Sequence, residues 1–297
     1  MKASFHQKIF DRVNIVVLTL ITISILYPLV FIASASISDP LLVGSGKVWL
    51  WPRGITFDGY VQVFKYPMLL TGYRNTIFYA VTATLITLAF NLPAAYALSR
   101  KELPGRNAIT AIFAFTMFFS GGLIPTFLVM KALGMINNIW AMIIPGAASM
   151  YSIIICRTYF QSSIPDSIQE AARIDGCSSF EIFFRIMLPL STPIIAVIAM
   201  FSVVGQWNAY FNALVYLQDS KLNPLQIVLR EILVMNQTTA LMGPQSALDM
   251  ESAARRARLV QIMKYALIII SSLPVLVVYP FFQRYFVKGI MIGAIKG

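Results

Sequence analysis

Four of the 12 acidic residues gather in one short segment, residues 163–190. Neighbouring carboxylates can serve as a general acid and a general base. Here, however, two of them follow a serine by three residues, in Ser167-x-x-Glu170 and Ser178-x-x-Glu181. This spacing is typical of a capping box, in which the serine and the glutamate bind each other's backbone N–H groups at a helix start. We therefore predict two helix starts in this segment rather than a catalytic site.

The elements around these carboxylates form a helix, a corner and a second helix. The first helix should follow Ser167 and end at Gly176, because glycine suits the left-handed position after a helix. The second helix should run from Ser178 into an apolar stretch. A short amphipathic helix outside the bilayer needs a partner to cover its apolar side, so we interpret it as a docking helix for a soluble protein. The residues expected on that side are Ile168, Ala171, Ala172 and Ile174.

The sequence gives little support for metal binding or nucleotide binding. The chain has one histidine, and Cys156 and Cys177 are too far apart for a CxxC motif, so we predict no metal site and two free thiols. Gly44-Ser45-Gly46-Lys47 resembles a phosphate loop superficially, but Leu41 stands where that motif needs glycine and Val48 where it needs serine or threonine. ATP chemistry is therefore expected in a partner.

The composition excludes a soluble enzyme. The 297 residues are 58% hydrophobic and 12% charged, whereas a soluble domain has roughly 25% charged residues. The formal net charge is +11, but no basic cluster is interleaved with exposed aromatics, so we expect no nucleic-acid partner. Membrane topology explains the excess of cations better.

Six charge-free windows carry the membrane prediction. Each is long enough for a helix that crosses about 30 Å of hydrocarbon. The first is too long for the apolar core of a signal peptide, and the windows lack the alternation of a β-barrel. We predict an all-α integral membrane protein. Its six spans are expected at residues 13–36, 75–99, 107–130, 138–160, 186–210 and 265–284.

The docking segment also resembles a known signature. Glu170-Ala171-Ala172, then Gly176, Ile186 and Leu188-Pro189, match EAA-x3-G-x9-I-x-LP of the permease subunits of bacterial ATP-binding-cassette (ABC) importers at every fixed position. FSGGLIPT (residues 119–126), GQWNAYFNALVYLQD (205–219) and FVKGIMIGAIKG (286–297) resemble the carbohydrate-importing branch, and NPLQIVLREIL (223–233) resembles its uronate-oligosaccharide subgroup. The maltose-type second permease is the group that the sequence resembles most.

The resemblance implies a type I ABC importer permease fold in the bacterial inner membrane. It implies cytoplasmic termini at residues 1–12 and 286–297, a transmembrane domain at 13–285 and a cytoplasmic coupling loop at 163–187. The short segment Arg100–Arg106, with three cations, agrees with that orientation. A polar helix at 246–264 should lead into the last span, and another should run from Pro224 through Val234.

The resemblance also implies partners and site residues. A second permease, two ATPase subunits and an extracytoplasmic binding protein would complete the importer, with ATP and Mg²⁺ bound by the ATPases and no cofactor in this chain. The C-terminal tail, with Lys296 and Gly297, is expected to contact the ATPases. The residues expected to couple to the ATPase are Ser167, Glu170, Ala171, Ala172, Asp175 and Gly176.

Two questions stay open at this stage. A secondary transporter or channel is the alternative from another class, although the charge-free windows offer no ionisable residue for ion coupling. Amides within or beside the windows either hold helices together or line a polar path for sugar, and the aromatics of residues 207–216 either stack on sugars or anchor at the interface. The amides are Asn75, Asn91, Gln206, Asn208 and Asn212.

Overall fold

The computed structural model describes residues 5–241 and 263–283, and most of these residues are helical. The chain divides into two compact units. The first consists of the described residues up to Leu69 and from Leu229 to Pro274, and the second of Leu70–Val228 and the described residues from Val275 onward. Each unit is treated by itself below.

The first unit contains the long helix α1 (Phe5–Ser36) and two short helices, α2 (Pro40–Gly44) and α3 (Asp58–Phe64). The start of the helix Met263–Gln283 also belongs to it. The ring of Phe31 on α1 meets that of Tyr265 edge-on at a centroid distance of 5.9 Å. Tyr60 donates a hydrogen bond of 2.8 Å to the Ser36 hydroxyl, and the Arg53 N–H donates to the Ser38 hydroxyl. Hydrogen bonds thus hold the segment after α1 to the end of that helix.

The resemblance of Gly44–Lys47 to a phosphate loop is superficial, as predicted. Ser45 is the C-cap of α2, and its N–H donates to the Leu41 carbonyl. A phosphate loop needs the N-terminus of a helix, where free N–H groups face the anion. This stretch instead follows the C-terminal end of one.

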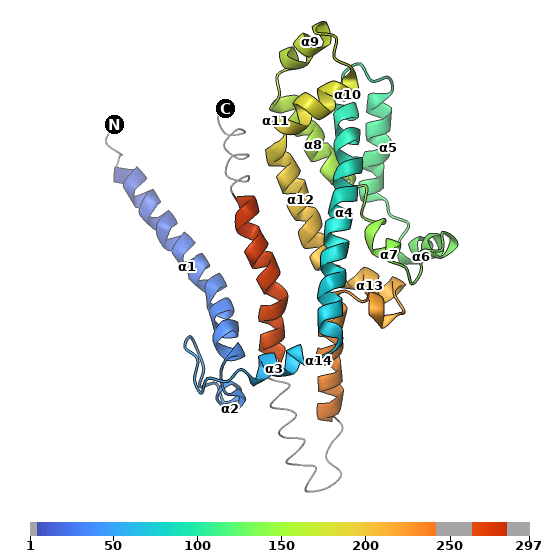
Figure 1. The fold of residues 1–297 in the computed structure, drawn as a ribbon. Coiled ribbons are helices and arrows are strands. Elements are labelled where there is room, and N and C mark those ends of the chain that lie inside the picture. Colours follow the sequence, from blue (N-terminus) through green and yellow to red (C-terminus); the bar gives the residue numbers. More distant parts are fainter. Residues whose placement is uncertain (1–4, 242–262, 284–297) are drawn as a thin grey trace. The chain divides into compact units, whose positions relative to one another are not determined.

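The second unit is built on α4 (Met68–Ser99), which packs with α8 (Met150–Ser162) and α12 (Thr192–Trp207). Tyr96 of α4 packs edge-on against Phe160 of α8, and both belong to the main apolar core. In Figure 1 these helices and α5 (Arg106–Phe118) run alongside one another, and α9 (Asp166–Ile174) lies beyond their upper ends. The other α-helices of this unit are α6 (Leu123–Ala132), α7 (Trp140–Ile143), α10 (Ser179–Glu181), α11 (Leu188–Leu190) and α13 (Tyr210–Tyr216). A π-helix, Ile182–Met187, joins α10 to α11, and a 3-10 helix, Ser220–Leu222, follows α13. Helix α14 (Leu225–Leu241) begins in this unit and continues in the first.

Much of the apolar surface is exposed. In α5 no residue is buried, and Phe118 and Ile112 are 81% and 65% exposed. The 18-residue apolar window in α1 has no buried residue either. Exposed apolar faces of this extent suit lipid or a second membrane subunit.

Three of the six apolar windows are not one continuous helix. The third is split into α5 and α6, which meet at 113° near Gly122, whose φ is +83°. The fourth is interrupted after the four-residue α7 by Pro145-Gly146. The fifth bends by 80° at Ser191, just before Pro193, whose ring displaces the carbonyl of the preceding turn.

The count of six spans therefore stays a prediction. Among the described residues, three helices are long and apolar enough to span a membrane, and five candidates result if each bent pair is one span. The three are Gln7–Ser36, Met68–Ser99 and Met263–Gln283. Proline and glycine break helices that apolar composition alone would have made continuous.

Four of the five amides make hydrogen bonds within the fold. Asn75 donates to the carbonyls of Lys221 and Asn223 at 2.7 and 3.1 Å, and thereby holds the turn before α14 against α4. Gln206 donates to the Met142 carbonyl, which connects α12 to α7. The Asn91 carbonyl accepts the Ser149 N–H, and Asn208 bonds within its own helix end.

The helix after Pro224 begins where predicted, at Leu225, but it continues to Leu241 instead of ending at Val234. The helix predicted at 246–264 lies almost wholly outside the described residues.

Candidate functional site

Helix α9 begins two residues earlier than its predicted capping box requires. Pro165 is the N-cap, with φ −58° and ψ 137°, and makes no side-chain cap hydrogen bond. Asp166 is therefore the first helical residue, and Ser167 lies inside the helix. The prediction that Ser167 and Glu170 form a capping box is wrong, because proline has the backbone angles of a helix start already set. Asp166 in the first turn is favourable, since a carboxylate there faces the positive end of the helix dipole.

The corner after α9 is formed as predicted. Gly176 has φ +84°, and its N–H donates to the Arg173 carbonyl at 3.1 Å. The Cys177 N–H donates to the Ala172 carbonyl at 2.9 Å. These two bonds define a Schellman motif, in which a left-handed residue ends the helix and satisfies its last carbonyls.

The second capping box is confirmed. The Ser178 hydroxyl accepts the Glu181 N–H, and the Glu181 carboxylate accepts the Ser178 N–H at 3.0 Å. The hydrogen bonds from the Ser178 backbone and hydroxyl, aided by Arg185, lower the pKa of Glu181 below its ordinary value. The turn between α9 and α10 is thus defined on both sides by local hydrogen bonds.

A clamp that the sequence analysis missed holds α9 from one side. It is formed by residues 99–102, at the end of α4. Lys101 pairs with Asp166 at 3.1 Å, and Glu102 pairs with Arg173 at 3.0 Å. The Glu102 backbone N–H and then Arg173 lower the pKa of the Glu102 carboxyl. Both pairs are exposed, so each contributes at most about 1 kcal/mol.

Arg100 makes the more buried part of this clamp. It donates to the Gln169 side chain of α9 and to the Ser99 hydroxyl at 2.8 and 2.9 Å. Its guanidinium also lies 5.0 Å from the centre of the Tyr96 ring, a cation–π contact. Burial lowers the pKa of Arg100. The signal in the sequence was the run Arg100-Lys101-Glu102, whose charges oppose those at the two ends of α9.

Two faces of α9 therefore differ. Gln169 and Ala172 are 3% and 6% exposed, and Ala172 joins the apolar core. The opposite face is open to solvent, and Ile174 is 86% exposed. Of the four residues predicted on an apolar side left open for a partner, Ile168, Ala171 and Ile174 are exposed. Ala172 packs inward instead, so the prediction is wrong for that residue. Residues at the spacing i, i+3, i+4 and i+7 share one face of a helix. On the outer face of α9 these residues are Ser167, Glu170, Ala171 and Ile174.

The other predicted site residues lie either at the end of α9 or outside the described residues. Asp175 is the C-cap of α9, and Gly176 is the corner; both are exposed. Lys296 and Gly297 lie outside the described residues. Cys156 and Cys177 are free thiols. In the described ranges no group of three His, Cys, Asp or Glu residues could hold a metal ion.

The second unit thus presents an exposed, tethered helix between apolar helices. Residues 69–292 match the family of inner membrane components of binding-protein-dependent transport systems, and the chain belongs to this family. These proteins are the permease subunits of ABC importers, transport subunits that work with a partner permease, an ATPase and a binding protein. The chain is therefore a multi-pass membrane protein and not an enzyme.

Two relatives and one solved structure are similar to nearly the whole chain. The chain is 39% identical to protein LplC of Bacillus subtilis over 98% of its own length and 96% of LplC. It is 37% identical to the B. subtilis polygalacturonan/rhamnogalacturonan transport system permease protein YtcP, over 98% of this chain and 99% of YtcP. A crystal structure of a bacterial ABC transporter involved in the import of the acidic polysaccharide alginate contains a similar chain. That likeness has a TM-score of 0.84 and 36% identity, and it covers 96% of this chain and 99% of that one.

Proposed function

We propose that this permease imports acidic oligosaccharides, such as fragments of pectin or alginate. Two independent likenesses support this substrate class. YtcP is named for polygalacturonan and rhamnogalacturonan, and the similar solved structure belongs to a transporter of alginate. All of these polymers contain uronate. The sequence resemblance to the uronate subgroup points the same way.

We further propose that the outer face of α9 docks on an ATPase subunit. Helix α9 then moves when ATP binding closes the pair of ATPase subunits. The observation that carries this proposal is the asymmetry of α9: Gln169 and Ala172 face inward, whereas Glu170, Ala171 and Ile174 are exposed. A helix that is tied on one side and open on the other transmits the force applied to its open side. Ser167, Asp175 and Gly176 complete the docking surface, and Lys296 and Gly297 of the tail contact the ATPase pair.

The clamp also bears on topology. Residues 99–102 contact α9, so the segment between α4 and α5 and the segment between α8 and α11 lie on the same side of the membrane. If an ATPase docks on α9, that side is cytoplasmic, and Arg100, Lys101 and Arg106 then follow the positive-inside rule. In this topology residues 1–12 and 286–297 are cytoplasmic, and residues 13–285 contain six spans.

The complete importer would then contain a second permease, two ATPase subunits and an extracytoplasmic binding protein in the lipid bilayer. ATP and Mg²⁺ bind to the ATPases, and this chain holds no cofactor and no nucleic acid.

A charge reversal on α9 tests the docking. We expect Glu170→Lys to lower the amount of ATPase that co-purifies with the tagged complex, and to reduce uptake of uronate oligosaccharide into proteoliposomes by at least about tenfold. Asp58→Lys, a matched reversal at an exposed residue of α3, is the control and should leave both unchanged. Normal co-purification and uptake in Glu170→Lys would refute the docking role.

The substrate class has its own test. Wild-type complex with its binding protein should take up labelled uronate oligosaccharides faster than neutral ones of equal length. Equal or greater uptake of the neutral sugars would refute the acidic class while leaving the permease assignment intact.

A further inference from the structure

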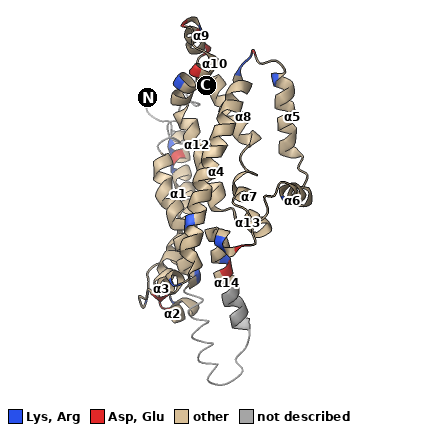
Figure 2. Ribbon diagram, turned by 45° about the vertical axis from the view of Figure 1, so that its right-hand side comes forward, with Lys and Arg blue, Asp and Glu red and all other residues tan. Residues whose placement is uncertain are grey.

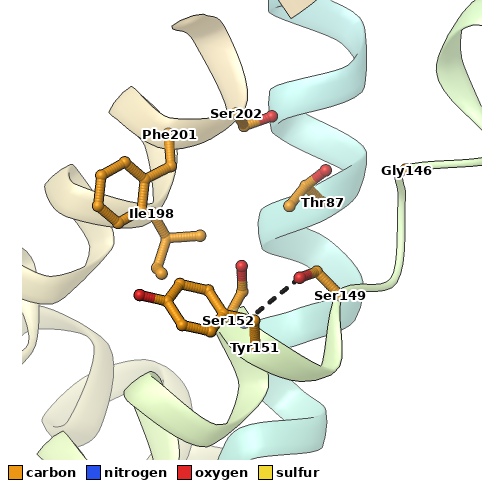
Figure 3. A pocket seen from close by; sticks show the side chains of 8 residues that line it. All are labelled: Thr87, Gly146, Ser149, Tyr151, Ser152, Ile198, Phe201 and Ser202. Carbon is orange, nitrogen blue, oxygen red and sulfur yellow. Dashed lines mark hydrogen bonds between the residues drawn. The ribbon is translucent and has the colours of Figure 1, made fainter. Parts of the chain in front are cut away.

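A cavity lined by hydroxyl groups and apolar side chains opens between the middle of α4, the start of α8 and the middle of α12. Its volume is about 440 Å³, which is within the usual range for ligand sites. Figure 3 shows its lining: Thr87 from α4, Ser149 and Ser152 from α8, and Ile198, Phe201 and Ser202 from α12. Gly146 and Tyr151 complete it.

The lining has an unusual chemistry for a cavity between apolar helices. It contains four serine or threonine residues and a tyrosine, but no Asp, Glu, Lys or Arg. Two aromatic side chains border it, Tyr151 and Phe201, which are 56% and 47% exposed. Hydroxyl groups can both donate and accept hydrogen bonds, as sugar hydroxyls do. An exposed aromatic ring next to them offers a flat apolar face for a pyranose ring.

One buried donor lies next to this cavity. Asn91 is fully buried, and its side-chain oxygen accepts the N–H of Ser149 at 3.1 Å. Its Nδ2 has no hydrogen-bond partner among the described residues. An unpaired buried donor next to the hydroxyl groups of the lining favours a polar ligand there.

The local backbone adds a preference for acidic ligands. The break at Pro145-Gly146 makes α8 begin at the cavity, with Ser149 as its N-cap and 13 residues behind it. The N-terminus of a helix carries a partial positive charge. A uronate carboxylate at this place would be stabilised without a lysine or arginine, which would be costly inside the membrane.

We propose that this cavity binds one ring of the passing oligosaccharide. Thr87, Ser149 and Ser152 hydrogen-bond the ring hydroxyls, Phe201 packs on its apolar face, and the start of α8 faces its carboxylate. The inference rests on the proposed function and deepens it, because it assigns part of the sugar path to this subunit.

The test uses the complete transporter in proteoliposomes with lumenal ATP. Thr87→Val with Ser152→Ala removes two hydroxyls and nearly preserves shape. We expect the initial uptake of uronate oligosaccharide to fall about tenfold, the effect of losing one or two hydrogen bonds. ATPase activity stimulated by the sugar-loaded binding protein should stay within about twofold, since α9 and its clamp are untouched.

Controls separate this inference from the proposed function. Thr158→Val removes an exposed α8 hydroxyl that bonds the Ile154 carbonyl of its own helix, and it should transport normally. If the double variant does not assemble, Phe201→Ala tests the same site, because that ring is half exposed. Uptake at the level of Thr158→Val in either assembled variant would overturn the inference. Failure of the wild-type complex to import any oligosaccharide would instead refute the proposed function.

Discussion

The docking helix α9 and the cavity between α4, α8 and α12 differ in chemistry. The docking helix α9 and its clamp are held by charged groups, with two ion pairs and an arginine that bridges to Gln169. The cavity between α4, α8 and α12 is lined by neutral groups alone. Figure 2 shows charged residues on α9 and at the ends of the helices next to it, whereas the middle of α4 has none.

This difference follows from the surroundings. Charged pairs are cheap in water and costly in hydrocarbon, where hydroxyls and helix ends must replace them. Helix α4 belongs to both regions, because Thr87 lines the cavity and Ser99 belongs to the clamp. The two positions are about 18 Å apart along the helix at 1.5 Å per residue. Helix α4 is continuous between them, with Pro93 inside it, and can carry a displacement from the clamp to the cavity.

The largest effect should come from the corner of α9. Gly176→Val places a β-branched residue at φ +84°. No atom would crowd its Cβ, so the cost is backbone strain alone, about 1–2 kcal/mol. We expect ATPase co-purification and uptake to fall about tenfold. Gly176→Asn should retain most activity, because asparagine tolerates this conformation. Wild-type uptake in the valine variant would show that the corner does not position α9.

The next effect should come from Arg100, the link between α4 and α9. Arg100→Ala leaves the Gln169 side chain buried without its partner. We expect uptake per ATP hydrolysed to fall about fivefold while ATPase activity persists, because a lost buried hydrogen bond costs about 1 kcal/mol or more. Arg100→Lys is the matched control for charge. If lysine restores coupling fully, charge rather than the geometry of the guanidinium is what matters.

The exposed ion pairs should matter less. Lys101→Glu breaks the pair with Asp166, and the further change Asp166→Lys restores it with reversed charges. We expect about a twofold loss of uptake and partial recovery in the double variant, with both differences shrinking at high salt. Equal uptake in the wild type and Lys101→Glu at low salt would show that this pair does not help to hold α9.

The smallest effect is the pH dependence. The pKa values of the Glu102 and Glu181 carboxyls are lowered from 4.5. The stability that their charged forms give to the folded protein is therefore complete above pH 4.5 and is lost as pH falls through the lowered pKa. Co-purification of the ATPase should therefore be constant from pH 8 to pH 5. A step within that range that Glu102→Gln and Glu181→Gln both abolish would contradict the assignment.

Local features were predictable from the sequence, and distant contacts were not. The corner at Gly176 and the capping box at Ser178 depend on neighbours within five residues, so their spacing identified them. The capping box at Ser167 failed because Pro165 takes the N-cap first.

The clamp was missed because Arg100 and Gln169 are 69 residues apart. The broken helices and the cavity were missed for a related reason. Long apolar windows predicted continuous spans, although Gly122 and Pro145 stand at the breaks. The hydroxyls that line the cavity are scattered over three helices, and only the fold brings them together.

Cross-linking measures the docking of α9 most directly. In a Cys177→Ser background, a thiol-reactive cross-linker is applied to membranes that contain the complete transporter, with Ala171→Cys or Arg173→Cys in this chain. Ala171 lies on the open face of α9, whereas Arg173 faces the clamp. The account predicts that Ala171→Cys captures the ATPase subunit and that the yield changes when ATP is added, with little capture from Arg173→Cys. Capture from Arg173→Cys but not from Ala171→Cys, or from neither, would contradict it.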